Sequence, residues 1–185
     1  MTLEITLEVA MTAKKEILEK MKNGDVFIHP TDTVYGIGCD ATNPSSVQRI
    51  KDIKKSRHPL SVIAPSMQWI RKNLIVNHDE FLNKFPGPYT LIMKKNDPEA
   101  MPWISKNDKI GVRMPDHLIT DLIKEFGKPF ITTSLNISGK PVIKNLKDLT
   151  KNMVDCVDVI INAGILKGRP STVYDLSGPK IVKIR

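Results

Sequence analysis

The side chains of this sequence that could do chemistry are mostly hydroxyls and cations, and they gather in short stretches that follow apolar runs. Residues 29–40 combine threonines, an aspartate and two glycines directly after a pattern typical of a buried strand. Gly36 and Gly38 permit positive φ angles or a close backbone approach, so this stretch could hold Thr31 and Thr33 against a ligand. A polar turn between a strand and a helix would have the same composition, and the stretch alone does not separate the two readings.

An arginine interrupts one later apolar run, and polar side chains end another. Thr132, Ser134 and Asn136 stand at the end of a predicted strand, where α/β sheets present ligand sites. Arg113 lies inside the apolar run 110–114, where burial is costly unless the guanidinium meets an anion. Its partner is therefore either a ligand phosphate or carboxylate, or an acidic side chain in an internal salt bridge.

Further cations and hydroxyls stand at the ends of other segments. Lys54, Lys55 and Arg57 close a predicted helix, and Ser171 begins a predicted strand near the carboxyl end. If these segment ends converge on one concavity, they form a site for a polyanion. The formal net charge of +8 agrees weakly with this hypothesis, because a basic protein favours anionic partners such as nucleotides or nucleic acid.

The sequence does not indicate other common kinds of site. It contains no P-loop, dinucleotide-binding or zinc-protease motif. Cys39 and Cys156 form neither a metal-ligand pair nor a disulfide framework, so we expect ordinary thiols in a reducing compartment. The histidines are scattered, and each is expected to be a surface residue or one with satisfied hydrogen bonds; they are His29, His58, His78 and His117. We therefore expect chemistry by positioning and charge, with no metal-binding residues and no obvious general base.

The elements that must position these side chains alternate between strands and helices. Periodicity predicts an edge strand over 3–9, a helix capped by Thr12 that stops at Asn23–Gly24, and a helix that begins with Asn43–Pro44. Asp116 is expected to cap a later helix. The other predicted strands are 26–28, 60–63, 89–93, 110–114, 130–134, 157–161, 171–176 and 181–185, and the other predicted helices are 66–72, 79–85 and 146–153. This alternation predicts an α/β fold with a partly mixed sheet.

Length and targeting signals bound the class of protein. The 185 residues suit one domain, residues 1–185. No apolar run approaches the ~20 residues of a membrane span, so we expect no membrane association. The amino terminus lacks the pattern of a signal peptide, so we expect a cytoplasmic protein.

Six motifs occur in an order that resembles the YrdC-like threonylcarbamoyl-adenylate synthase family. They lie at residues 29–36, 54–57, 86–91, 112–117, 132–139 and 170–176, and the resemblance extends over residues 23–185. One such motif would carry little weight, whereas six in order are highly specific. The resemblance implies a twisted, partly mixed open sheet with flanking helices around a basic cavity.

The resemblance also implies an enzyme that makes threonylcarbamoyl-AMP and pyrophosphate from L-threonine, bicarbonate or carbon dioxide, and ATP with Mg²⁺. A separate tRNA threonylcarbamoyl transferase complex would then place the threonylcarbamoyl group on the adenosine beside the anticodon. The residue chemistry agrees, because a carbamate formed on the threonine amine is already an anionic nucleophile. Its attack on the α-phosphorus needs positioning and charge stabilisation more than a strong base.

Matching the motifs position by position implies roles for single residues. Arg113 would pair with the threonine carboxylate, and Lys54 or Lys55 would help to neutralise the phosphates. The implied threonine-binding residues are Thr33, Arg113, Thr132 and Ser171. The implied ATP-binding residues are Arg57, Ser134, Asn136 and Arg185, with Lys54, Lys55 and Arg57 as the catalytic cations.

Two departures from the family pattern leave questions open. The segment after the 54–57 motif is short, so the register does not decide which of the two lysines is the family residue. Ile63 or Ala64 stands where some members carry a threonine-binding histidine. The alternatives are an RNA- or nucleotide-binding module without synthase activity, and a carbamoyl-adenylate activity like that of the related domain in hydrogenase maturation. The acylphosphatase and zinc-finger segments that accompany the latter domain do not occur in this sequence.

Overall fold

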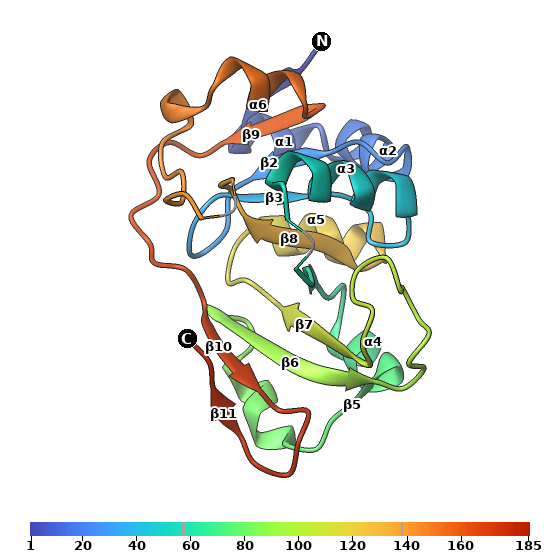
Figure 1. The fold of residues 1–185 in the computed structure, drawn as a ribbon. Helices are drawn as coiled ribbons and strands as arrows, with labels where there is room; N and C mark the ends of the chain where they lie inside the picture. The colour runs from blue at the N-terminus through green and yellow to red at the C-terminus, as the bar shows by residue number, and fades with distance from the viewer. Residues whose placement is uncertain (57, 138) are drawn as a thin grey trace.

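The computed structural model describes residues 1–56, 58–137 and 139–185. Within these residues the strands are β1 (Leu3–Thr6), β2 (Phe27–His29), β3 (Gly36–Gly38), β4 (Ser61–Ile63), β5 (Leu74–Ile75), β6 (Tyr89–Lys95), β7 (Lys109–Arg113), β8 (Phe130–Ser134), β9 (Val159–Asn162), β10 (Thr172–Asp175) and β11 (Val182–Lys183). They form one twisted sheet in the order β1-β9-β2-β3-β8-β4-β7-β6-β10-β11, with β5 beside β6 (Figure 1). Parallel pairs such as β1 with β9 and antiparallel pairs such as β2 with β3 both occur, which confirms the mixed α/β sheet.

Short helices flank this sheet. They are α1 (Leu7–Thr12), α2 (Lys14–Lys22), α3 (Pro44–Lys54), α4 (Met67–Asn73), α5 (Ile119–Phe126) and α6 (Lys151–Asp155), with 3-10 turns η1 (Asp79–Lys84) and η2 (Leu146–Asp148). Helix α3 begins as predicted, because the Asn43 side chain accepts a hydrogen bond from the Ser46 amide at 3.2 Å and Pro44 occupies the first turn. Among the described residues, no helix is both long and apolar enough to cross a membrane.

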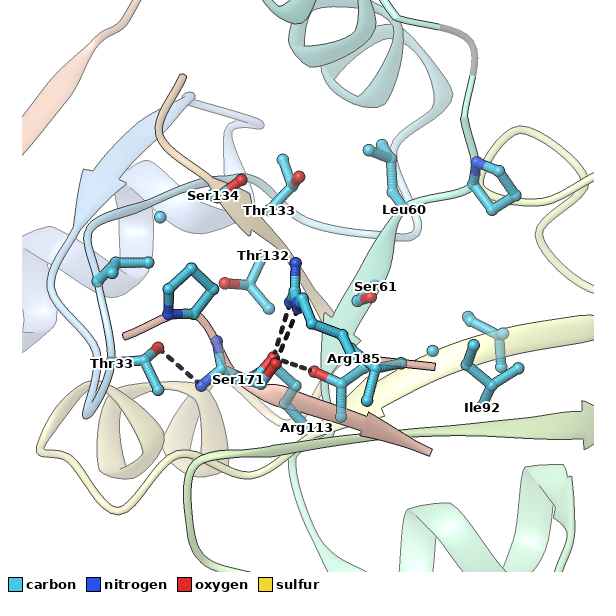
Figure 2. A pocket seen from close by; sticks show the side chains of 18 of the residues that line it. Thr33, Leu60, Ser61, Ile92, Arg113, Thr132, Thr133, Ser134, Ser171 and Arg185 are labelled. Atoms are coloured by element: carbon cyan, nitrogen blue, oxygen red, sulfur yellow. Dashed lines mark hydrogen bonds between the residues drawn. The ribbon is translucent and has the colours of Figure 1, made fainter. Parts of the chain in front are cut away.

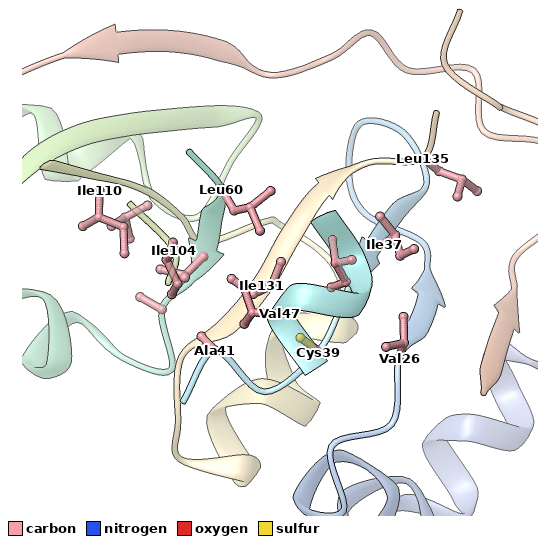
Figure 3. Packing of buried hydrophobic residues seen from close by; sticks show 14 of the residues in the cluster. Val26, Ile37, Cys39, Ala41, Val47, Leu60, Ile104, Ile110, Ile131 and Leu135 are labelled. Carbon is pink, nitrogen blue, oxygen red and sulfur yellow. The ribbon is translucent and has the colours of Figure 1, made fainter. Parts of the chain in front are cut away.

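Two groups of buried side chains pack on the two faces of the sheet. On one face Val47 of α3 packs in a cluster with Ile37 of β3 and Ile131 of β8 (Figure 3). On the other face Phe130 of β8 packs in a cluster with residues of α2 and α5. Because side chains alternate along a strand, Thr132 shares the face of Phe130. Beyond the cover of α2 and α5, that face carries the cavity described below.

The amino-terminal strand is shorter than predicted. Strand β1 does lie at an edge, but it ends at Thr6, whose side chain accepts a hydrogen bond from the Val9 amide at 3.2 Å and caps α1. Residues 7–9 are therefore helical, because a local cap overrides their alternating pattern. Thr12 does not cap a helix; its hydroxyl bonds back to the carbonyls of Glu8 and Val9.

Three further expectations need correction. The Asp116 side chain does not cap α5, whose preceding residue is Leu118; instead the Asp116 amide donates to Asp32 Oδ2 at 3.1 Å. The helix predicted over 146–153 is divided into η2 and α6, because Thr150 caps α6 in mid-segment. Part of the stretch 29–40, for which we predicted no strand, is strand β3, which pairs with β2 and β8.

Both cysteines are free thiols, in agreement with expectation. Cys39 is fully buried in the cluster around Val47, and burial raises the pKa of its thiol. A thiol in this setting is inert, so the place of Cys39 in the stretch 29–40 reflects packing.

His29 is neither a surface residue nor a fully satisfied one. It is completely buried in the sheet, with its ring edge-on to Phe130 at a centroid distance of 5.9 Å. Nδ1 donates to the Pro30 carbonyl at 3.2 Å, whereas Nε2 finds no hydrogen-bond partner among the described residues. The ring lies directly over β3: a Cβ on Gly36 would approach His29 Cε1 to 2.9 Å, which explains the need for glycine there.

Lowering the pH from 6.5 to 4 is expected to destabilise the fold through His29. Burial lowers the pKa of this imidazole from 6.5 to about 4. In this window the unfolded chain therefore binds a proton that the folded protein does not. The cost is absent above pH 6.5 and grows to about 3 kcal/mol near pH 4. Denaturant unfolding at pH 7 and pH 4 measures it, and in His29→Phe the same pH change should cost correspondingly less. An equal loss in both proteins would assign the effect to other groups.

Candidate functional site

A cavity of about 480 Å³ opens on the sheet face that Thr132 shares. Small residues of neighbouring strands form part of its lining: Gly36 of β3, Ser61 of β4, Gly111 of β7 and Thr132 of β8. A Cβ on Gly111 would lie 2.6 Å from Ser61 Oγ, so larger side chains do not fit there. The small residues leave room for a ligand and present it with hydroxyls (Figure 2).

Arg113 projects from the end of β7 and is only 7% exposed. Its Nη2 donates to Asp32 Oδ1 at 2.8 Å. The same nitrogen donates to Thr33 Oγ1 at 3.1 Å (Figure 2). Burial lowers the pKa of Arg113, and the Asp32 carboxylate opposes this effect. Within the described part of the chain Nε has no partner. The internal salt bridge that the sequence left open is therefore real, yet the guanidinium retains donors and lines the cavity.

Ser171 and Arg185 lie together in the cavity lining. Ser171 precedes β10, which runs parallel to β6, and its hydroxyl is 2.8 Å from that of Thr90. Arg185 Nε donates to the Ser171 carbonyl at 3.0 Å, and Nη2 lies 3.4 Å from Ser171 Oγ. Arg185 thus lies beside the hydroxyl pair as a second cation of the cavity, and these contacts hold its guanidinium (Figure 2).

Lys54 ends α3 and is 7% exposed. Its Nζ donates to the Ser134 carbonyl at 2.6 Å, to the Asn136 carbonyl at 3.1 Å and to Asn136 Oδ1 at 3.0 Å. Burial lowers the pKa of this amine to about 8. Ser134 Oγ donates to the same Asn136 amide oxygen at 2.8 Å. Lys54 therefore fastens the end of α3 to the loop after β8, directly behind the cavity wall.

Lys55 lies in a different environment from Lys54. It adopts a left-handed conformation with φ 49°, is exposed, and lines a separate hollow with Lys51 and Lys106. The structure thus brings Lys54, and not Lys55, together with Ser134 and Asn136. Arg57 lies outside the described residues.

The crossing segment, residues 163–171, leads from β9 to β10 and passes over Thr33. A Cβ on Gly168 would lie 1.9 Å from the Thr33 carbonyl oxygen, so only glycine allows this contact. Tyr35 anchors the start of the segment: its hydroxyl donates to the Gly164 carbonyl and accepts from the Ala163 amide, each at 2.8 Å. The segment therefore encloses the cavity beside Thr33.

The predicted site residues fall into four groups. Those that line the cavity are Thr33, Arg113, Thr132, Ser134, Ser171 and Arg185. Lys54 and Asn136 stand behind its wall, Lys55 lies outside it, and Arg57 is not described. Three residues with contacts in or beside the site were not predicted from the sequence: Asp32, Thr90 and Lys109. Lys109 lines the cavity together with Asp175, and its Nζ lies 3.4 Å from Asp175 Oδ2. Asp32 and Thr90 lie inside recognised motifs, which was a usable signal; nothing marked Lys109.

The donor set of the cavity suits a small anionic ligand. Two guanidinium groups and several hydroxyls face the cavity. The Asp175 carboxylate also lines it, but this group accepts a hydrogen bond from the Ser177 hydroxyl and forms an ion pair with Lys109. Across the described ranges, no group of three or more histidines, cysteines or carboxylates could hold a metal ion. The arrangement can therefore bind a carboxylate or phosphate and position it through hydrogen bonds.

Comparisons with known proteins identify relatives of this chain. The model of the Sua5/YciO/YrdC family, described as "Telomere recombination", matches residues 19–185. A protein of Methanocaldococcus jannaschii named putative threonylcarbamoyl-AMP synthase is 37% identical, with 93% of this chain and 86% of that protein covered. A Vibrio campbellii threonylcarbamoyl-AMP synthase is 30% identical, with 91% and 97% covered.

A solved structure shows the same architecture. The crystal structure of P. abyssi Sua5 complexed with L-threonine matches 100% of this chain with a TM-score of 0.84 and 26% identity. The chain spans 57% of the length of that structure. Since the family model covers most of the chain and relatives at least 30% identical cover nearly all of it, the chain belongs to the Sua5/YciO/YrdC family.

Proposed function

We propose that this chain is an L-threonylcarbamoyladenylate synthase. It makes threonylcarbamoyl-AMP and pyrophosphate from L-threonine, bicarbonate or carbon dioxide, and ATP. The observation that carries the proposal is the buried Arg113 beside Thr33, at the edge of a hydroxyl-lined cavity. Such a pair suits an amino-acid carboxylate next to a polar group, and two relatives named as synthases are 37% and 30% identical to this chain.

The proposed reaction needs little from the protein beyond placement. Threonine lies with its carboxylate on Arg113 and its amine carboxylated to a carbamate. A carbamate oxygen attacks the α-phosphorus of ATP, the bond from that phosphorus to the bridging oxygen breaks, and pyrophosphate leaves with the electron pair. Arg185 and the loop of Ser134 face the nucleotide, and Lys54 holds that loop. Cations at these places stabilise the charge that develops on the leaving group.

Magnesium enters this proposal as part of the substrate. The Mg²⁺ ion arrives on the ATP phosphates, because phosphate oxygens and water suit this hard cation and nucleotide sites rarely need a full set of protein ligands. The protein contribution is then to bind the nucleotide in line with the carbamate.

The product implies a place in tRNA modification. Threonylcarbamoyl-AMP is a mixed anhydride and must pass to a separate transferase that acylates the adenosine beside the anticodon. We include this transferase complex as a downstream partner and the cytoplasm as the location. Direct RNA binding is not needed for synthesis of the adenylate.

The test is an assay of the purified protein with ATP, Mg²⁺ and bicarbonate, with and without L-threonine. Pyrophosphate release should depend on threonine, and mass spectrometry should detect threonylcarbamoyl-AMP. Pyrophosphate release that ignores threonine would reject the proposal. Salt-sensitive RNA binding with no calorimetric binding of ATP or threonine would favour the RNA-binding alternative.

A further inference from the structure

The hydrogen bonds around Thr31 fix the direction of every proton in its network. Thr31 is 3% exposed, and its Oγ1 lies 2.7 Å from the Val34 carbonyl oxygen. A carbonyl can only accept, so the single hydroxyl proton of Thr31 is committed to Val34. The Thr33 amide, at 3.1 Å, can only donate and therefore uses one lone pair of Thr31 Oγ1. What remains on this oxygen is a lone pair.

This inventory decides the polarity of the Thr33 hydroxyl. Thr33 Oγ1 lies 2.9 Å from Thr31 Oγ1, and either atom could donate on distance alone. Because the Thr31 proton is already used, Thr33 must donate to Thr31. Arg113 Nη2 then donates to Thr33 Oγ1 at 3.1 Å. The Thr33 oxygen has spent its proton and one lone pair, so it can offer only its second lone pair to a ligand.

The neighbouring Arg113 guanidinium offers hydrogen-bond donors in place of an acceptor. Both Nη2 protons of Arg113 are committed, one to Asp32 at 2.8 Å and one to Thr33. Its N–H groups on Nη1 are still donors, whereas the Nε–H, which has no partner among the described residues, is itself buried. The site therefore presents an acceptor at Thr33 beside donors at Arg113 (Figure 2).

We propose that Thr31, which does not line the cavity, is a positioning and specificity residue for the amino-acid substrate. By accepting the Thr33 proton, it holds the Thr33 hydroxyl as a pure acceptor. The substrate must then bring a hydrogen-bond donor to Thr33 and an acceptor to Arg113. In threonine the donor is the α-ammonium or the β-hydroxyl, and the acceptor is the carboxylate. This inference rests on the proposed function and deepens it.

Without the Thr31 hydroxyl, Thr33 Oγ1 is no longer restricted to accepting hydrogen bonds from a ligand. The Thr33 hydroxyl regains a free proton that can rotate toward the cavity, where it opposes a substrate donor. A mismatched hydrogen bond in a desolvated site costs about as much as a missing one. Thr31 thus acts on the substrate through Thr33, although it does not contact the cavity itself.

The experiment compares Thr31→Val, which keeps the shape, with Thr31→Ser, which keeps the hydroxyl. The KM for threonine should rise roughly 5- to 20-fold in Thr31→Val, with kcat and the KM for ATP within about twofold of wild type. Thr31→Ser should restore wild-type behaviour. Thr2→Val is a matched control, because the Thr2 hydroxyl also donates to backbone carbonyls but at the edge of the sheet. If Thr31→Val does not fold, Thr31→Ala serves in its place.

Two analogues identify the donor by calorimetry. 2-Aminobutyrate keeps the ammonium and lacks the hydroxyl, whereas 3-hydroxybutyrate keeps the hydroxyl and lacks the ammonium. The inference is supported if wild type binds one analogue more tightly than Thr31→Val does and both proteins bind the other analogue equally. The donor to Thr33 is then the group that the first analogue keeps. Equal threonine binding by wild type and Thr31→Val overturns the inference alone. Failure of the wild type to bind threonine overturns the proposed function as well.

Discussion

Replacing Arg113 with alanine is expected to weaken threonine binding by roughly 30- to 1,000-fold, the equivalent of about 2 to 4 kcal/mol for a charge-assisted pair in a desolvated site. ATP binding should change little, because Arg113 faces Thr33 and Asp32 on the proposed amino-acid side of the cavity. Calorimetry with each substrate separately, followed by steady-state kinetics, measures this division of labour.

The variant has a structural cost that must be separated from the binding effect. Arg113→Ala leaves the Asp32 carboxylate, at 10% side-chain exposure, without its cation. The double variant Asp32→Asn/Arg113→Gln removes both charges and should recover most of the stability without recovering threonine binding. If threonine binding returned along with stability, or if Arg113→Ala weakened both substrates equally, Arg113 would be only a structural ion pair.

Replacing Lys54 with methionine is expected to lower kcat/KM for ATP by at least about 100-fold. The loss has two causes: a cation next to the proposed nucleotide side disappears, and three oxygens of Ser134 and Asn136 lose the hydrogen bond from Lys54. The wild-type rate should also fall as the pH rises through about 8, because the pKa of Lys54 is lowered to about 8 and the amine is a cation only below it. A pH profile of kcat/KM for ATP at saturating threonine measures this limb.

Lys51→Met is the matched control, since Lys51 lies one turn earlier on α3 and faces the separate hollow. It should keep both the rate and the alkaline limb. Lys54→Arg keeps the charge at high pH, so whatever activity it retains should not fall near pH 8. A wild-type rate in Lys54→Met, or an unchanged alkaline limb in Lys54→Arg, would contradict this role of Lys54. Lys55 and Arg57 would then be the cations to test.

Local chemistry explains why parts of the fold were predictable from sequence. The start of α3 follows from Asn43 and Pro44, which need no distant partner to act as a cap and a first turn. The end of α2 at Asn23, with Gly24 at φ 82°, follows from glycine alone. We assigned the cap of the first helix to Thr12 and did not consider Thr6, because the alternating pattern of residues 3–9 indicated a strand through that position.

The site, like the fold, was predictable from the sequence only in part. The hydroxyls and cations could be listed from their motifs, but their partners depend on strand register. Thr90 meets Ser171 only because β6 lies parallel to β10, and Asp32 meets Arg113 across 81 residues of chain. Strand β3 was missed because two glycines break the usual strand pattern; it exists because β2 and β8 hold it from both sides. His29 was misjudged because burial is a property of the sheet and not of its neighbours in sequence.

The position of β9 has a consequence for how the protein acquires its structure. This strand is inserted between β1 and β2, and residues 3–6 pair with residues 159–162. A ribosome needs roughly 10 to 30 seconds to reach β9 at typical speeds of synthesis. Throughout that interval β1 has no neighbour and β2 has an open edge, and closing so long a loop also makes this pairing slow. The first strand made is thus completed by one of the last, so the nascent chain must keep two unpaired strand edges from other partners until nearly the whole sequence has emerged.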